Sequence, residues 1–179
     1  MFGLMKMIKS AILFFYNLMH IVKRSFWTAF IKITCKKYGK RLTVNAKSSI
    51  GRNVTIGENC HFNGMNISEG GEVYIGDNFH SATKCEIIVQ FHNYDTGVSI
   101  PYDHSVVCKS VIIEANVWLG YHVIILGNVH IGEGAIIQAG SVVVNNIPKC
   151  SIAGGNPARV FKMRDVMHYE KLKVSGKFN

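Results

Sequence analysis

One hydrophobic spacing limits what this chain can fold into: between residues 113 and 143 an aliphatic residue recurs at every sixth position. Neither a helix, with its period of about 3.6, nor an ordinary hairpin produces that spacing. A short strand followed by a tight turn does, because side chains alternate between two faces along a strand. The repeat therefore predicts a prism-shaped β-solenoid whose stacked coils bury the aliphatic residues. These residues are Ile113, Leu119, Ile125, Ile131, Ile137 and Val143.

The same period begins earlier in the chain, at Val44, and it is interrupted once over a long stretch. Between Ile87 and Val107 the step is 20 residues, which is not a multiple of six. We therefore expect a solenoid domain over residues 42–159 with a loop protruding at about 89–105. An irregular loop of this length in a compact domain is usually functional.

Cysteine usage and length place the chain among single-domain proteins of a reducing compartment. Its 179 residues are enough to bury a core. The 5 cysteines are an odd number and include no Cys-x-x-Cys pair. This spacing favours reduced thiols and a cytoplasmic protein over a disulfide framework.

The positive charge of the chain is concentrated at its N-terminus. Residues 1–41 contain nine basic residues and no acidic residue, so the remaining eleven of the 20 basic residues balance the 11 acidic ones. The longest uncharged apolar run, Ser10 to Val22, is thirteen residues long, whereas a membrane span needs about twenty. No small-residue cleavage site follows it, which argues against a signal peptide.

Residues 1–41 are therefore expected to form a basic amphipathic helical segment. Two placements fit this composition: the helix lies on an anionic membrane surface, or it packs against the solenoid or a neighbouring subunit. Nucleic-acid binding is not expected, because large aliphatic residues rather than interleaved polar ones dominate the basic stretch.

Residues 111–144, with their Val117-Trp-Leu-Gly element, and the later Gly154-Gly-Asn-Pro-Ala-Arg159 resemble the hexapeptide-repeat acyltransferases. The nearest groups are the xenobiotic and streptogramin acetyltransferases and the O-acetyltransferases of surface polysaccharides, and the likeness covers about residues 44–165. It implies an all-β fold, a left-handed parallel β-helix, which is an exception to the usual right-handed crossover. It also implies a homotrimer with acetyl-CoA bound between subunits. A short C-terminal helix or tail is expected over residues 160–179.

Transfer of an acetyl group to a hydroxyl needs a base, and histidine suits this role near neutral pH. The resemblance implies that His92, in Phe-His-Asn-Tyr-Asp on the expected loop, is the general base. The group that orients its second ring nitrogen stays open among Asp95, Asp103, Glu114 and any backbone carbonyl. Asp95 and Tyr102 are expected to contact the acceptor.

The remaining site residues also come from the resemblance. The backbone amide of Tyr121 would stabilise the oxyanion, because a fixed amide dipole needs no particular side chain. The alternation of the repeat sends Trp118 outward, either as a wall for the pantetheine arm or acceptor, or into the trimer interface. The other contacts implied for CoA are the backbone at Gly120 and Ala139 and the cations Arg159 and Lys162, which suit the nucleotide phosphates.

One departure from the family concerns the CoA phosphates. Many relatives have Thr-Lys where this chain has Val144-Asn145, so one phosphate contact is missing or replaced. A γ-class carbonic anhydrase is a second candidate on the same solenoid, but it needs two histidines five residues apart, and this chain has none. No metal site is therefore expected.

These observations favour an acetyl-CoA-dependent O-acetyltransferase in the cytoplasm, either free or peripheral at the inner face of the membrane. The acceptor would be a sugar hydroxyl in a surface polysaccharide or its lipid-linked precursor. The alternatives are a hydroxyl of an antibiotic or other xenobiotic, or an amino sugar. A non-catalytic scaffold is disfavoured because the chain keeps His92, Trp118 and the Asn-Pro-Ala-Arg ending together.

Overall fold

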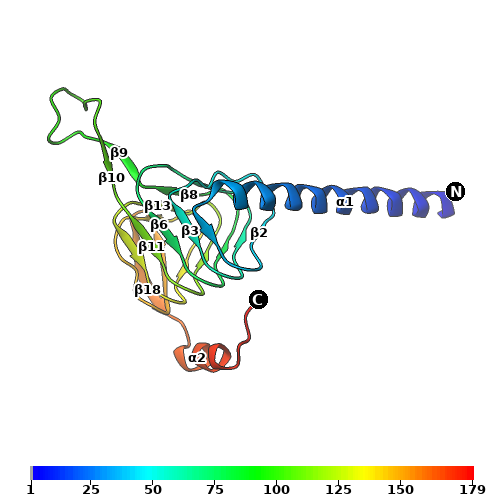
Figure 1. Ribbon diagram of the computed structural model, residues 1–179. Helices are drawn as coiled ribbons and strands as arrows, with labels where there is room; N and C mark the ends of the chain where they lie inside the picture. The colour runs from blue at the N-terminus through cyan, green and yellow to red at the C-terminus, as the bar shows by residue number, and fades with distance from the viewer. Residues whose placement is uncertain (1) are drawn as a thin grey trace.

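The chain folds into a parallel β-solenoid of about six turns, with a helix at each end of the chain (Figure 1). The computed structural model describes residues 2–179. Most strands are only two to four residues long. A strand of this length followed by a turn occupies one hexad, so the solenoid predicted from the period of six is confirmed.

Three sheets form the faces of the prism, and strands named next to each other below are neighbours in their sheet. The five-stranded face contains β1 (Lys37–Tyr38), β3 (Val54–Ile56), β6 (Val73–Ile75), β11 (Val111–Ile113) and β14 (Val129–Ile131). The seven-stranded face contains β18 (Ala158–Met163), β17 (Ser151–Gly155), β15 (Ile136–Ile137), β12 (Trp118–Leu119), β7 (His80–Ser81), β4 (His61–Phe62) and β2 (Thr43–Val44). The four-stranded face contains β16 (Val142–Val143), β13 (Ile124–Leu126), β8 (Cys85–Ile88) and β5 (Met65–Ile67).

The inward residues of the hexads stack into one continuous core. Along β11 the exposure alternates as the sequence predicts, with Val111 and Ile113 buried and Ile112 exposed. Each buried aliphatic side chain contributes about 1.5–3 kcal/mol relative to an exposed one. The six residues that define the period are all 0% exposed: Ile113, Leu119, Ile125, Ile131, Ile137 and Val143.

Three rows of turns separate the faces of the prism. The hairpin edge joins the four-stranded to the five-stranded face, and the tyrosine edge, which contains Tyr121, joins the seven-stranded to the four-stranded face. The asparagine edge joins the five-stranded to the seven-stranded face and contains Asn59, Asn78 and Asn116. These three asparagines adopt positive φ angles of 55°, 54° and 62°, a conformation that asparagine tolerates better than most residues.

The loop expected at about 89–105 is a β-hairpin that projects from the hairpin edge (Figure 1). Its strands are β9 (Gln90–His92) and β10 (Val106–Cys108), which pair antiparallel with Val107 opposite Phe91. The excursion therefore reaches Cys108. Val107, which fits the spacing of a solenoid position, lies instead on the exposed stem of the hairpin.

Helix α1 (Phe2–Thr34) covers the first part of the basic segment. Its last two turns dock on the start of the solenoid: the Val44 amide donates to Thr28 Oγ1 (2.9 Å), Thr34 Oγ1 donates to the Ile50 carbonyl (2.8 Å), and Ile31 is fully buried. The rest of α1 extends away from the coils (Figure 1). By length and composition alone, Met5–Thr34 could cross a membrane.

The C-terminal residues close the other end of the solenoid and then fold back along it. Strand β18 pairs antiparallel with β17, so the segment expected as a tail over 160–179 begins inside a strand. Helix α2 (Val166–Val174) follows, and Asp165 caps its N-terminus by accepting from the His168 amide (2.9 Å). Tyr169 is the residue of α2 that is buried against the solenoid.

Candidate active site

The candidate base, His92, lies at the end of β9, where the hairpin stem opens into its loop. Its ring stacks on Tyr102, with the ring centroids 3.9 Å apart and the planes 13° from parallel. Tyr102 therefore limits how the imidazole can turn, while His92 stays exposed to solvent. A contact between Tyr102 and an acceptor stays a prediction.

The three carboxylates considered as partners of His92 are placed differently. Asp103 braces the loop: it accepts from the Val98 amide (3.0 Å) and from the amide of Ser105 (2.8 Å) and its hydroxyl. Glu114 accepts from His130 (2.7 Å) and from the Glu133 amide (2.8 Å). Asp95 is exposed. Within residues 2–179, none of the three is hydrogen-bonded to the His92 ring.

The hydrogen bonds at Asp103 also set its charge. The hydroxyl of Ser105, followed by the amides of Ser105 and Val98, holds the pKa of the Asp103 carboxyl below its ordinary value. The carboxylate is therefore ionised at neutral pH, and it fixes the shape of the loop beyond His92.

A second group of predicted residues lies together at the tyrosine edge. The Gly120 amide donates to the Ile137 carbonyl (2.8 Å), and a Cβ added at Gly120 would lie 2.6 Å from the Ala139 nitrogen. Glycine is therefore required here by close backbone approach. Among residues 2–179, no acceptor is paired with the Tyr121 amide, which leaves this donor available to a ligand.

Trp118 stands on the outer face of β12, as the alternation predicts, and is 54% exposed. Its neighbours in register on that face are His80 on β7 and Ile136 on β15. His80 in turn stacks on His61, with centroids 4.5 Å apart. Burial and then the neighbouring His80 lower the pKa of His61, which favours the neutral form of the His61 ring.

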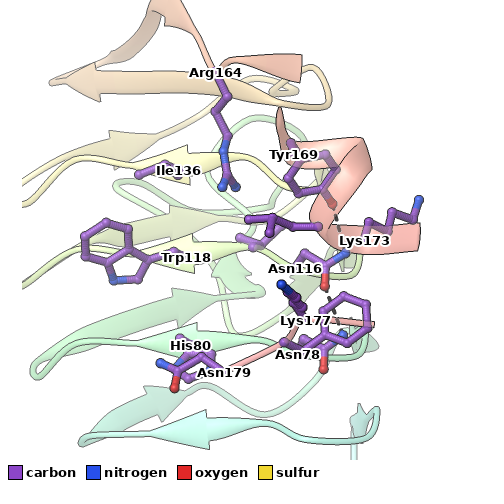
Figure 2. A pocket seen from close by; sticks show the side chains of 13 residues that line it. Asn78, His80, Asn116, Trp118, Ile136, Arg164, Tyr169, Lys173, Lys177 and Asn179 are labelled. Atoms are coloured by element: carbon purple, nitrogen blue, oxygen red, sulfur yellow. Dashed lines mark hydrogen bonds between the residues drawn. The ribbon is translucent and has the colours of Figure 1, made fainter. Parts of the chain in front are cut away.

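A cavity of about 530 Å³ opens beside Trp118 between the seven-stranded face and the C-terminal residues (Figure 2). Its walls include His80, Arg164 and Lys177. Sequence reasoning missed this cavity, because α2 and the chain after it form one wall, and no local pattern shows where a terminal helix docks. Cations on two sides and an exposed indole make the cavity suited to an anionic ligand with apolar parts.

Tyr169 holds α2 against the asparagine edge. Asn116 Nδ2 donates to Tyr169 Oη (2.8 Å), and Tyr169 Oη donates to Glu133 Oε1 (2.9 Å). Lys173 pairs with the same carboxylate (2.6 Å). Burial and then the hydrogen bond to Glu133 raise the pKa of the Tyr169 hydroxyl far above its ordinary value. The position of α2, and so the cavity wall, depends on this network.

The two cations expected to bind CoA phosphates, Arg159 and Lys162, lie on β18 at the last coil, and both are exposed. Arg159 Nη1 donates to the Ala158 carbonyl (2.9 Å). Both side chains are therefore accessible to an anion, and their contact with CoA stays a prediction. No group of three histidine, cysteine, aspartate or glutamate residues that could hold a metal ion occurs within the described part of the chain.

The structure thus gathers the predicted residues into two groups at two different edges. His92, Asp95 and Tyr102 belong to the hairpin edge, whereas Gly120 and Tyr121 belong to the tyrosine edge. The two edges border the four-stranded face on opposite sides. One chain therefore does not bring the base next to the oxyanion donor by itself.

Comparison with known proteins finds relatives that share the six-residue repeat. Residues 110–145 match the family model described as bacterial transferase hexapeptide (six repeats). Galactoside O-acetyltransferase of Escherichia coli is 34% identical over 127 residues, which cover 69% of this chain and 62% of that protein. A relative from Staphylococcus aureus is 39% identical over 124 residues, which cover 65% of this chain and 55% of the relative. The chain thus spans less than two thirds of either relative.

Solved structures give the same picture. A galactoside acetyltransferase in complex with coenzyme A superposes with a TM-score of 0.65 at 29% identity, covering 79% of this chain and 71% of that one. A hexapeptide-repeat acetyltransferase of Vibrio cholerae, complexed with acetyl coenzyme A, gives 0.64 at 23% identity over 75% and 74% of the two chains, a likeness that shows the fold alone.

The fold and the repeat define a hexapeptide-repeat β-solenoid. Residues 110–145 carry the hexapeptide repeat of the family model, and the relatives and solved structures named above are acetyltransferases, so the chain is similar to acetyltransferases of the hexapeptide-repeat type.

Proposed function

We propose that this protein is an acetyl-CoA-dependent O-acetyltransferase that acts on a sugar hydroxyl. The observation that carries the proposal is the placement of His92. The longest interruption of the hexapeptide coils is the hairpin, and that hairpin presents an exposed histidine whose ring stacks on Tyr102. Its relative in Escherichia coli is a galactoside O-acetyltransferase, which supports a sugar acceptor.

The reaction needs a proton acceptor and a stabilised oxyanion. His92 takes the proton from the acceptor hydroxyl as its oxygen attacks the thioester carbonyl. The amide of Tyr121 donates to the carbonyl oxygen as it becomes negative. Collapse of this intermediate breaks the C–S bond, transfers the acetyl group, and releases CoA, whose sulfur receives the proton that His92 holds. No acyl-enzyme is formed.

The active site lies between two chains of a homotrimer. The separation of the hairpin edge and the tyrosine edge in one chain supports a site between two chains, since the base and the oxyanion donor must meet the same carbonyl group. The resemblance to hexapeptide-repeat acyltransferases supports a trimer. The hairpin of one subunit supplies His92, and the next subunit supplies the amide of Tyr121. Asp95 and Tyr102 then lie on the acceptor side of the cleft.

Acetyl-CoA occupies the cleft along the coils of the second subunit. Because Gly120 has no side chain and lies close to Ala139, the backbone there is open to the pantetheine arm, and the exposed Trp118 forms the wall of the cleft beside that arm. Arg159 and Lys162 bind the nucleotide phosphates. The basic cavity beside Trp118 offers Arg164 as a further cation, which would replace the contact that the family makes where this chain has Val144-Asn145.

The acceptor is a hydroxyl of a surface polysaccharide or of its lipid-linked precursor, and the protein works in the cytoplasm. A hydroxyl on an antibiotic or an amino group on an amino sugar would use the same base and the same cleft. The panel of acceptors in the assay separates these alternatives.

The test is release of free CoA thiol from acetyl-CoA across a panel of galactosides, other sugars, amino sugars and antibiotics. We expect turnover with a sugar hydroxyl. His92→Ala should lower kcat by about 10²–10⁴-fold, while His104→Ala, on the same hairpin, stays near wild type. Near-wild-type turnover by His92→Ala would refute the assignment of the base.

A further inference from the structure

Most of helix α1 has no partner in the fold, although it is rich in large apolar side chains. Its last turns contact the solenoid, through Trp27, Thr28, Ile31 and Thr34. Every residue from Met5 to Phe26 is exposed. A soluble chain rarely leaves so large an apolar surface uncovered unless that surface binds something.

One continuous row of apolar side chains lies on the side of α1 opposite the solenoid, while Leu13, Phe14 and Ile21 lie outside that row. Ile31, which docks, shares its face with Arg24 and Asn17, because steps of seven residues return to the same side of a helix. The face opposite is an apolar stripe whose large side chains are between 50% and 81% exposed. The stripe consists of Ile8, Ile12, Phe15, Met19, Val22, Phe26, Ala29 and Ile33.

The charges of α1 identify the kind of surface that the stripe meets. Lys9, Lys23 and Lys32 flank the stripe, and residues 1–41 contain no acidic side chain. Apolar side chains bordered by cations alone suit a layer that is apolar below and anionic at its surface, which describes a bilayer with acidic lipids.

A second copy of α1 is a poorer occupant of this stripe. Steps of three and four residues would also suit a coiled coil, but the flanking positions of such a bundle carry pairs of opposite charge. Here the flanks would bring lysine against lysine. Met5–Thr34 is long and apolar enough to cross a membrane, but its uncharged run from Ser10 to Val22 has only thirteen residues, whereas a span needs about twenty. Insertion across the bilayer is therefore an outcome of the test.

We propose that α1 binds the surface of an anionic lipid bilayer, with the apolar stripe inserted among the acyl chains and the basic residues among the headgroups. The solenoid, which docks on the opposite face of α1, is then held on the aqueous side. If the proposed acetyl transfer is correct, this placement favours a lipid-linked acceptor, and that part of the inference rests on the proposed function.

The test uses the full chain and sedimentation with vesicles of phosphatidylcholine alone or mixed with phosphatidylglycerol. We expect strong binding to the mixed vesicles, weak binding to phosphatidylcholine alone, and release by high salt. Phe15→Ser combined with Met19→Ser should lower the partition coefficient about tenfold or more. The matched pair on the polar face, Asn17→Ser with His20→Ser, should leave it unchanged.

Removal of positive charge from α1 provides a second, independent test of binding to acidic lipids. Lys23→Gln with Arg24→Gln should weaken binding to mixed vesicles by roughly tenfold or more and should not alter binding to phosphatidylcholine. These α1 residues are exposed, so the unfolding midpoint should stay constant in every variant, and turnover of a soluble sugar acceptor without vesicles should also stay constant.

The proposal would be overturned by no binding of the wild type to either vesicle, by equal loss in the apolar-face and polar-face pairs, or by a change of oligomeric mass in Phe15→Ser/Met19→Ser without loss of vesicle binding. Resistance of the bound protein to alkaline carbonate would replace surface binding by insertion across the bilayer. Vesicle binding without acetyl transfer to any acceptor would refute the proposed function and leave the membrane site standing.

Discussion

The tyrosine edge and the hairpin edge belong to the same solenoid and share close backbone packing, yet only the hairpin edge carries a long projecting segment. A Cβ at Gly120 on the tyrosine edge would lie 2.6 Å from the Ala139 nitrogen, and one at Gly71 on the hairpin edge would meet the Lys109 carbonyl oxygen. The hairpin edge releases a stem whose loop leaves Val98 and Ile100 both 95% exposed. The tyrosine edge suits a fixed oxyanion donor, and the projecting hairpin suits a base delivered to another chain.

The largest effect on turnover should come from removing the base at the hairpin edge or the oxyanion donor at the tyrosine edge, each in its own variant. Tyr121→Pro removes the amide hydrogen, and we expect kcat to fall by about 10²–10³-fold. Tyr121→Ala keeps the amide and should retain most of the activity. Circular dichroism and the unfolding midpoint would show whether the proline variant keeps its fold.

Mixing the two defects then separates one-chain from two-chain sites. Oligomers refolded from a mixture of His92→Ala and Tyr121→Pro chains contain clefts with both functional groups intact, so turnover should rise well above that of either variant alone. Activity that stays at the level of the single variants would mean that the base and the oxyanion donor act from the same chain.

The next effect compares the stability of the coils with that of the hairpin. Ile125 is fully buried in the unbroken coils, and Ile125→Ala should lower the free energy of unfolding by about 2–5 kcal/mol. Ile100→Ala, at the exposed tip of the hairpin, should change it by less than about 0.5 kcal/mol. Urea unfolding at one fixed protein concentration measures both. A similar loss in the two variants would show that the hairpin tip is buried in the assembly.

The solenoid could be predicted well from the sequence, because every coil carries the same six-residue spacing of aliphatic residues. The period of six gave the buried aliphatic residues, the alternation turned Trp118 outward, and the break in the period located the hairpin. It misjudged where the hairpin ends, since Val107 has the same β-branched side chain whether it faces a core or an exposed stem.

Contacts between distant parts of the chain left no such signal. Asn116 meets Tyr169 across 53 residues, so neither residue predicts the other. One clue was present: Asn59 and Asn78 are 19 residues apart, about one coil, and Asn116 follows after a further 38, which is one coil plus the hairpin, so the three asparagines form a ladder at one edge. The cavity beside Trp118 needed the position of α2, which only the folded chain provides.

A smaller effect tests the third edge. Tyr169→Phe removes a hydroxyl that bonds Asn116 and Glu133, and it should lower the free energy of unfolding by about 1–2 kcal/mol. Burial raises the pKa of this hydroxyl above the ordinary value of 10.0. Its contribution to the free energy of unfolding is therefore intact below pH 10.0. That contribution is lost as pH rises above this value, because the unfolded chain releases the proton first. Unfolding curves from pH 8 upward should show this loss in the wild type and lack it in Tyr169→Phe.

The smallest effect separates the shape of the hairpin from its stability. Asp103→Asn weakens the acceptor for the Val98 and Ser105 amides, so these amides should exchange with solvent faster while the global unfolding midpoint stays constant. Hydrogen bonds hold the pKa of Asp103 below its ordinary value, so its bracing is present above that value and is lost as pH falls through the lowered pKa. Acid should therefore loosen the wild-type loop and leave Asp103→Asn unaffected. If acid and Asp103→Asn leave the exchange of both amides unchanged, the loop keeps its shape without this carboxylate, and the ring stack of His92 on Tyr102 is then the feature that positions the base.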